Sequence, residues 1–212
     1  MSRRFLAISV LVAAIALVAG LLALDVPIVF AVHASEFENL PLFVDGLHLL
    51  DSAFGMRVSY WLAPGVCLTL GLVALRLARA NRLSQVLATA IVSAGLVQAA
   101  TIGAMMLGKN AFGRLRPVQL LESGDWSLIW FAGGGSFPSG HSAFYFGLFL
   151  PLAASAPRVW QRAVLLTIPF FAIAARIDMS KHFLSDVSAS ALIAACLALL
   201  AASCLPRSAP SR

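Results

Sequence analysis

The chain has 212 residues, of which 60% are hydrophobic and only 11% charged, and its formal net charge is +6. A soluble domain of this size does not carry so large an apolar fraction, so the composition predicts a single integral membrane domain over residues 1–212. The 15 lysines and arginines are scattered through short loops and form no basic patch that alternates with aromatic residues. This argues against nucleic acid as a partner and favours charges that set membrane topology.

Residues 5–24 form the first apolar run, directly after Arg3 and Arg4. The arrangement imitates a secretory signal peptide, but the run is longer than a typical cleavable core, and no clean small-residue cleavage pattern precedes Asp25. We therefore expect a retained first membrane span.

Six apolar segments can be placed along the chain, at residues 5–24, 59–75, 84–107, 140–156, 160–176 and 183–204. They predict an all-α, polytopic membrane helix bundle with six transmembrane helices. The fourth and fifth segments are short for a hydrocarbon core of about 30 Å at a rise of about 1.5 Å per residue. We expect these two to be buried and tilted, or extended by the motif residues that flank them.

The loop charges predict an orientation. By the positive-inside rule, one side faces the cytoplasm and includes both termini, because it carries Arg3, Arg4, Arg76, Arg79, Arg82, Arg158, Arg162, Arg207 and Arg212. The opposite side carries acidic residues, namely Asp25, Glu36, Glu38, Asp45, Asp51, Glu122 and Asp125. It also carries cations that break the rule and therefore need another reason to lie there: Lys109, Arg114, Arg116, Arg176 and Lys181.

Apolar residues recur at helical spacing within residues 40–54 of the first outer loop, at Phe43, Leu47, Leu50 and Phe54. Asp45, His48 and Asp51 fall elsewhere on the helical wheel, so we expect a short helix that lies in the membrane interface. His33 and His48 lack companion ligands at a usable spacing, and no metal site is predicted there.

A Gly-rich approach leads into Ser136-Phe137-Pro138-Ser139-Gly140-His141, which interrupts the apolar chain. A helix that begins near Ser139 would leave the N–H groups of Ser139, Gly140 and His141 without intrahelical partners, and such a helix start binds phosphate well. His141 adds a group that can give or take a proton near neutral pH. An ordinary helix cap with a chance histidine is the alternative at this point.

Two further polar motifs lie at the ends of apolar segments. In the first, Lys109 and Arg116 are seven residues apart, so a helix that Pro117 ends would place both on one face, where they either reach lipid headgroups or hold an anion. In the second, His182 and Asp186 stand at i and i+4 on one helical face. A carboxylate there fixes the imidazole tautomer and makes the other nitrogen more nucleophilic, although a purely structural bond would also explain the pair.

Taken together, these motifs resemble those of the type 2 phosphatidic acid phosphatase superfamily. Its three parts occur in order as Lys109-x6-Arg116-Pro117, Pro138-Ser139-Gly140-His141 and Arg176-x5-His182-x3-Asp186. That superfamily includes membrane lipid phosphatases, glucose-6-phosphatase and the vanadium haloperoxidases. One departure is that Ala175 precedes Arg176, where many members have serine.

The resemblance implies specific roles. His182 would attack phosphorus and form a phosphohistidine, Asp186 would orient its imidazole, and His141 would protonate the leaving oxygen and then activate water. The phosphoryl oxygens would be held by Lys109, Arg116, Arg176, Ser139 and Gly140. No metal and no cofactor is implied, and Arg114 is an extra cation that we expect to bind lipid headgroups.

The expected activity is hydrolysis of a membrane-embedded lipid phosphate or pyrophosphate, on the periplasmic side of a bacterial inner membrane. Candidate substrates are isoprenyl pyrophosphate, phosphatidylglycerol phosphate, phosphatidic acid and lipid A phosphates. Residues 118–132, with Trp126, Trp130 and Phe131, and residues 40–54 are expected to recognise the rest of the lipid. Lipid-to-lipid phosphotransfer and non-catalytic lipid binding stay open as alternatives, whereas the haloperoxidases are larger and soluble.

Overall fold

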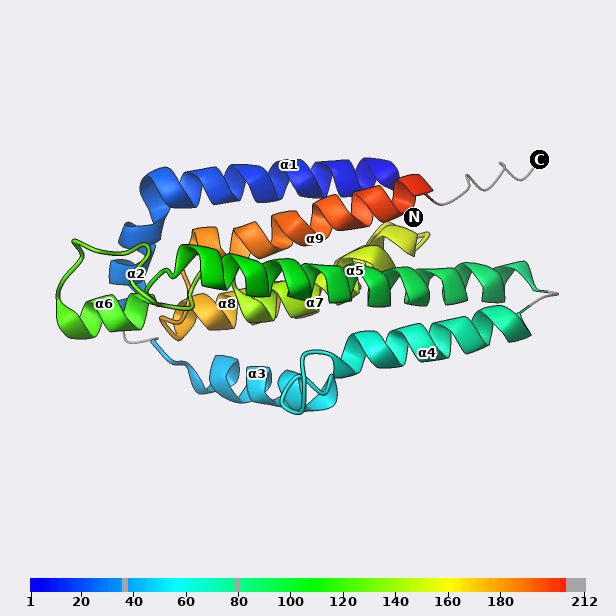
Figure 1. The fold of residues 1–212 in the computed structure, drawn as a ribbon, viewed down its shortest axis with the longest axis horizontal. Coiled ribbons are helices and arrows are strands. Elements are labelled where there is room, and N and C mark those ends of the chain that lie inside the picture. The colour runs from blue at the N-terminus through cyan, green and yellow to red at the C-terminus, as the bar shows by residue number, and fades with distance from the viewer. Residues whose placement is uncertain (36–37, 79–80, 205–212) are drawn as a thin grey trace.

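The protein is a bundle of helices in a computed structural model that describes residues 1–35, 38–78 and 81–204, with the Arg82 side chain left aside (Figure 1). Within these ranges every regular element is helical, which confirms the predicted all-α class. In chain order the elements are α1 (Arg3–Ala19), a π-helical turn (Gly20–Leu24), α2 (Asp25–His33), α3 (Pro41–Ala53), α4 (Leu62–Leu77), α5 (Arg82–Phe112), α6 (Pro117–Ser123), α7 (Gly140–Ser155), α8 (Val159–Asp178) and α9 (Leu184–Cys204).

The central helix is α7, which packs against α5, α8 and α9. Almost all of its side chains are buried, and Phe144, Tyr145, Leu148 and Phe149 belong to the main apolar core. Because α7 is surrounded by other helices, its sixteen residues need not match the full thickness of a membrane. The short fourth apolar segment is therefore buried, as one of the sequence expectations allowed.

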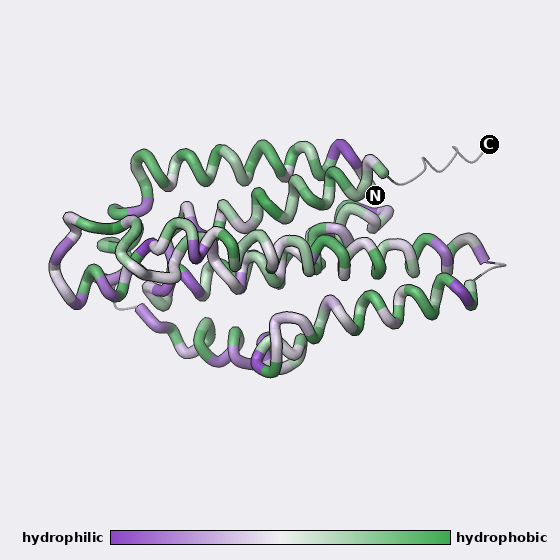
Figure 2. Tube along the Cα trace, in the orientation of Figure 1, coloured by the Kyte–Doolittle hydropathy of each residue, from purple (hydrophilic) through white to green (hydrophobic). Residues whose placement is uncertain are grey.

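Four helical segments are long and apolar enough to cross a membrane, at Arg3–His33, Leu83–Ser123, Val159–Asp178 and Leu184–Cys204. Helix α4 is a shorter apolar helix of sixteen residues. The apolar residues cover most of the length of the bundle, as the hydropathy trace shows (Figure 2). The protein is thus of the helical membrane type, and the count of six spans stays a prediction.

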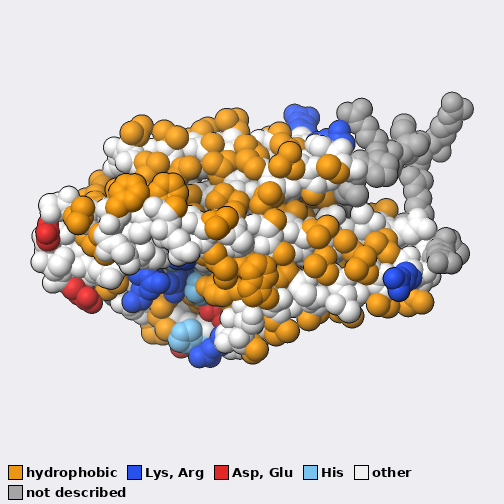
Figure 3. Space-filling model, viewed as in Figure 1, with side chains coloured by type: hydrophobic (Ala, Val, Ile, Leu, Met, Phe, Trp, Pro, Cys, Tyr) orange, Lys and Arg blue, Asp and Glu red, His pale blue; other side chains and the backbone are white. Residues whose placement is uncertain are grey.

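Polar residues gather at the two ends of the bundle. The N-terminus, the end of α7 and the end of α9 meet at one end, because the Ser2 N–H bonds to the Ala154 carbonyl and Arg3 bonds to the Ala202 carbonyl. Arg162 also lies at this end, over the Phe5 ring. The opposite half of the molecule carries a second group of cations with histidine and acidic side chains (Figure 3). The predictions for Glu36, Arg79, Arg207, Arg212 and the Arg82 side chain lie outside the described residues.

Helix α3 is the helix predicted for the first outer loop, and it packs lengthwise along the bundle against α8 (Figure 1). Phe43 contacts the Phe171 ring, with the ring centroids 5.4 Å apart, and Leu47 is buried. Asp51, which the helical wheel assigned to the polar side, is 7% exposed and faces the core instead. One face of α3 is therefore part of the bundle, and its position at a membrane interface stays a prediction.

Candidate active site

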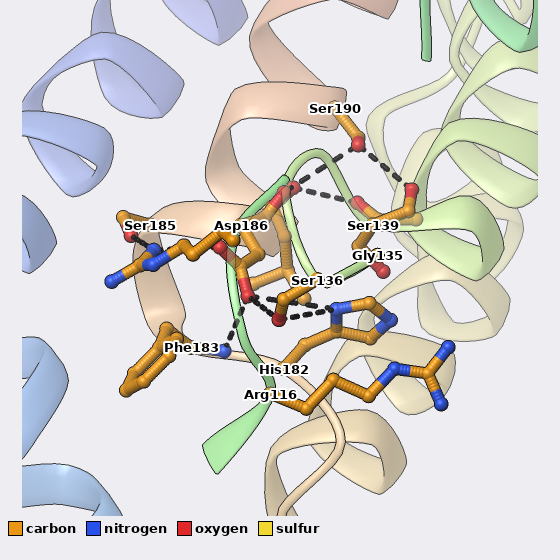
Figure 4. A network of polar contacts seen from close by, with 12 residues as sticks. Arg116, Gly135, Ser136, Ser139, His182, Phe183, Ser185, Asp186 and Ser190 are labelled. Carbon is orange, nitrogen blue, oxygen red and sulfur yellow. Dashed lines mark hydrogen bonds and ion pairs between the residues drawn. The ribbon is translucent and has the colours of Figure 1, made fainter. Parts of the chain in front are cut away.

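His182 lies in the short connection between α8 and α9, with its side chain 2% exposed. Its Nδ1 atom is 3.5 Å from Oδ2 of Asp186, in the first turn of α9. The other ring nitrogen points away from this carboxylate, on the side where Arg116 lies (Figure 4). Burial lowers the pKa of His182 to about 3, although Asp186 opposes the shift, so the imidazole is neutral at neutral pH.

The Asp186 carboxylate is held from several sides. Oδ1 accepts a bond of 2.6 Å from Arg114, and Oδ2 accepts bonds of 2.5 Å from the Ser136 hydroxyl and 2.8 Å from the Phe183 N–H (Figure 4). These donors fix both oxygens and favour the charged form of the carboxylate. Asp186 is therefore a fixed negative charge beside the Nδ1 atom of His182.

Arg114 corrects the expectation that it binds lipid headgroups, because it is only 3% exposed. It forms a second ion pair of 2.8 Å with Asp25, and its guanidinium lies between the Trp130 and Phe183 rings. A buried guanidinium needs charged partners, and its two carboxylates supply them. Trp130, expected to recognise lipid, thus packs on Arg114.

Asp25 was expected in the outer loop but is buried where the π-helical turn meets α2. Its carboxylate accepts hydrogen bonds from the N–H and hydroxyl of Ser185, next to Asp186. Gly20 permits this approach, because a Cβ atom there would lie 2.8 Å from the Ser185 nitrogen. The first helical segment is in this way bonded to the start of α9.

Lys109 and Arg116 do not share a helix face, contrary to the expectation. Helix α5 ends at Phe112, Gly113 adopts a left-handed conformation with φ 49°, and Arg116 is extended. Pro117 begins α6 and does not end α5, since a proline at the first helical position lacks only an N–H that would have no partner. Both cations still reach the site: Lys109 donates to the Gly135 carbonyl, and its charge interacts with those of Arg116, Arg176 and Asp186.

Helix α7 begins at Gly140 with Ser139 as its N-cap, so the predicted helix start is confirmed. The Ser139 N–H is not open to a ligand as expected, because it donates to the Asp186 carbonyl over 3.1 Å. The N–H groups of Gly140 and His141 have no hydrogen-bond partner among the described residues. A Cβ atom on Gly140 would lie 2.7 Å from the Tyr60 hydroxyl, which explains the glycine.

Two buried side-chain donors in this region have no acceptor within the part of the chain that the structure describes. The Ser139 hydroxyl and the Arg176 Nε atom are buried without a hydrogen-bond partner among the described residues. The charges of Arg176 and Arg116 repel one another, as do those of Lys109 and Arg116. Converging cations and buried donors without acceptors are the expected surroundings of a bound anion.

His141 has its own carboxylate, which the sequence reasoning missed. Its Nε2 atom is 3.0 Å from Oδ2 of Asp51, and the Tyr145 hydroxyl donates to Oδ1 over 2.7 Å. The available signal was spacing, since Asp51 follows the core residue Leu47 by four positions and so shares its helix face. His33 and His48 are not part of the site: His33 pairs with Glu38 at 2.9 Å, and His48 is exposed.

The arrangement thus contains a buried, neutral imidazole beside Asp186, a second imidazole beside Asp51, and a group of three cations. A family model for the PAP2 superfamily matches residues 83–210. Neither the search of curated proteins nor the search of solved structures found a match. The matched segment contains all eight residues that the sequence assigned to the site, whereas Asp25 and Asp51 lie before it.

Proposed function

The chain belongs to the PAP2 superfamily, and on this basis we propose that it hydrolyses a lipid phosphate or pyrophosphate through a phosphohistidine intermediate. The site supports this proposal best through one observation. Three mutually repelling cations, Lys109, Arg116 and Arg176, gather beside two histidines that are each paired with a carboxylate. Such a set holds an anionic group between a nucleophile and an acid.

In the first step, the lone pair of His182 Nε2 attacks phosphorus, and the bond between phosphorus and the leaving oxygen breaks. The Nδ1–H of His182 faces Asp186, which stabilises the positive charge that develops on the ring. His141, as an imidazolium, donates its proton to the leaving oxygen and becomes neutral. The alcohol or phosphate product departs and leaves phosphohistidine.

In the second step, water attacks the same phosphorus, and the bond between phosphorus and His182 Nε2 breaks. His141 takes a proton from this water and is thereby returned to its charged form. The sum of the two steps is consumption of one water and release of inorganic phosphate. No other reactant is needed.

The phosphoryl oxygens carry their charge through both steps, so their surroundings must neutralise it. We assign this task to Lys109, Arg116 and Arg176, with the Ser139 hydroxyl and the Gly140 N–H. In many phosphoryl-transfer enzymes Mg²⁺ and a lysine share this work. Here the cations of the chain itself supply the charge, and we assign no metal or cofactor to the reaction.

Candidate substrates are isoprenyl pyrophosphate, phosphatidylglycerol phosphate, phosphatidic acid and lipid A phosphates. We favour an isoprenyl pyrophosphate or a lipid A phosphate, in the inner membrane of a bacterium. In this proposal six helices cross the bilayer, both termini are cytoplasmic, and the site opens on the periplasmic side. The arginines at the end of the bundle where the N-terminus and the end of α9 meet support that orientation.

The test is release of inorganic phosphate by the purified protein from a panel of these lipids, with His182→Asn as the inactive control. We expect activity in EDTA and inhibition by vanadate, which imitates the trigonal-bipyramidal phosphoryl group. Lack of phosphate release from every lipid would contradict the proposal and favour a lipid-binding role. Phosphate that appears on an added acceptor lipid would indicate a phosphotransferase.

A further inference from the structure

The Asp51 carboxylate lies between two donors of α7 although it belongs to α3. It accepts from His141 Nε2 over 3.0 Å and from the Tyr145 hydroxyl over 2.7 Å. Tyr145 is fully buried in the main core, which holds its hydroxyl in one place. Asp51 is therefore clamped, and its contact with His141 is set by the packing of α3 on the bundle.

We propose that Asp51 is the positioning residue of the acid–base histidine, so that the site contains a second His–carboxylate pair. This inference rests on the proposed function, because His141 is the proton donor and acceptor of that reaction. Asp51 precedes the segment that the family model matches. The N-terminal part of the chain thus completes the acid half of the site.

The Asp51 carboxylate determines which ring nitrogen of His141 carries the proton. A carboxylate can only accept, so the hydrogen between the two groups is carried by Nε2 of His141. Nδ1 is then the nitrogen that carries the lone pair in the neutral ring and the transferable proton in the charged ring. Asp51 also stabilises the charged ring, which the first step consumes and the second step regenerates.

The charge of Asp51 is maintained by its neighbours. Burial would raise the pKa of the Asp51 carboxyl, but His141, the Tyr145 hydroxyl and the Arg176 charge outweigh it and hold the pKa below its usual range. Tyr60 also interacts electrostatically with this carboxylate. A carboxylate that remains ionised is what the positioning role requires.

A purely structural role for Asp51 would be to tie α3 to α7. The two roles differ in their dependence on the leaving group, because only a poor leaving group needs the proton of His141. An alkyl phosphate and a nitrophenyl phosphate that carry the same apolar tail separate them. Loss of structure lowers kcat/KM for both substrates by one factor, whereas loss of the acid lowers it mainly for the alkyl phosphate.

The experiment compares wild type, Asp51→Asn, Asp51→Glu and Asp45→Asn with both substrates. Asp45 is the matched control, because it is an exposed carboxylate on the same helix. For Asp51→Asn we expect kcat/KM to fall about 100-fold or more with the alkyl phosphate and less than about threefold with the nitrophenyl phosphate. Asp51→Glu should recover part of the loss. Asp45→Asn should leave the ratio of kcat/KM between the two substrates as it is in wild type, because any effect on recognition of their shared apolar tail is the same for both.

Equal losses with the two substrates, or no loss with either, would overturn the role of Asp51. A wild type that is inactive on both substrates contradicts the proposed function instead. Nitrogen NMR of the four histidines tests the pair without activity, with His141→Gln used for assignment. A neutral His141 protonated on Nε2 in wild type supports the proposal, and protonation on Nδ1 overturns it, even where Asp51→Asn fails to fold.

Discussion

His182 and Asp186 stand four residues apart at the start of α9, whereas His141 and Asp51 come from α7 and α3 and are 90 positions apart. The first pair is sealed, with side chains 2% and 0% exposed. The second pair is more open, at 16% and 11%. The sealed pair carries the proposed nucleophile, and the open pair carries the proposed acid and base.

The difference corresponds to two chemical tasks. A nucleophilic imidazole must stay neutral, and burial secures this by disfavouring its charged form. An acid–base imidazole must exchange its proton with the leaving group and with water, so it needs contact with the opening of the site. The two carboxylates also differ in how firmly they are held. Asp186 accepts hydrogen bonds from Arg114, Ser136 and the Phe183 N–H, whereas Asp51 accepts them from His141 and Tyr145.

The largest predicted effect distinguishes the two His–carboxylate pairs by the reaction step that stops when the histidine of each pair is replaced. His182→Asn should lower phosphate release by on the order of 10⁴-fold or more and leave no phosphorylated protein. His141→Asn should still be phosphorylated by a nitrophenyl phosphate, and the phosphorylated protein should accumulate because no base activates water. Rapid quenching with labelled substrate measures both.

A labelled His182→Asn protein would place the nucleophile elsewhere. The absence of label from both variants, while the wild type shows a burst, would mean that His141 is required for the first step even with a good leaving group. Either result would contradict the assignment of the nucleophile to His182 and of separate acid–base chemistry to His141.

The sealed half could largely be predicted from the sequence, because its key residues lie close together along the chain. His182 lies just before α9 and not on its face as expected, but Asp186 in the first turn of α9 is only four residues further along the chain. Local spacing is enough to infer such contacts. The helix proposed for Lys109 to Arg116 was wrong because Gly113 turns the chain out of α5.

The remaining groups could not be predicted because tertiary packing places them. Arg114 resembled a surface cation because its two carboxylate partners, Asp25 of α2 and Asp186 of α9, are distant from it in the sequence. Asp25 resembled a loop residue, but Gly20 allows the π-helical turn to approach Ser185. Asp51 was one of several acidic residues of the first outer loop, and only the docking of α3 distinguishes it. Buried ion pairs between distant segments leave no local pattern.

The next largest effect is expected at Arg114, which links the sealed half to the N-terminal segment. Arg114→Met leaves Asp25 and Asp186 buried without their shared cation, so stability should fall by about 3–5 kcal/mol. Arg116→Met removes a cation of the cradle and should lower activity with little change in stability. Thermal unfolding in detergent measures both, and an Arg114→Met protein that melts like wild type would contradict the role of this network.

A smaller effect is expected in the pH dependence of stability, where the sealed His182 should contribute. The pKa of His182 is 6.5 in the unfolded chain and about 3 in the folded protein. The unfolded state therefore binds the proton first as pH falls, and the free energy of unfolding decreases between these two values. By pH 5 the loss from His182 should be about 2 kcal/mol, and His182→Asn should remove it. His48→Asn, on the exposed side of α3, is the control. If the melting temperatures of wild type and His182→Asn fall by the same amount between pH 7 and pH 5, the imidazole of His182 is not sealed and neutral.

The smallest effect concerns the clamp on Asp51. Tyr145→Phe removes one donor to the carboxylate but keeps the ring in the core, so it should cost about 1 kcal/mol, or about fivefold in kcat/KM for an alkyl phosphate. In the Asp51→Asn background the same substitution should have almost no further effect, because the hydroxyl acts through the carboxylate. Additive losses in this double-mutant cycle would mean that Tyr145 acts on the substrate or on the core and not through Asp51. If Tyr145→Phe causes no further loss in the Asp51→Asn background, then Asp51 of α3 positions the acid–base histidine, although α3 lies outside the segment that the family model matches.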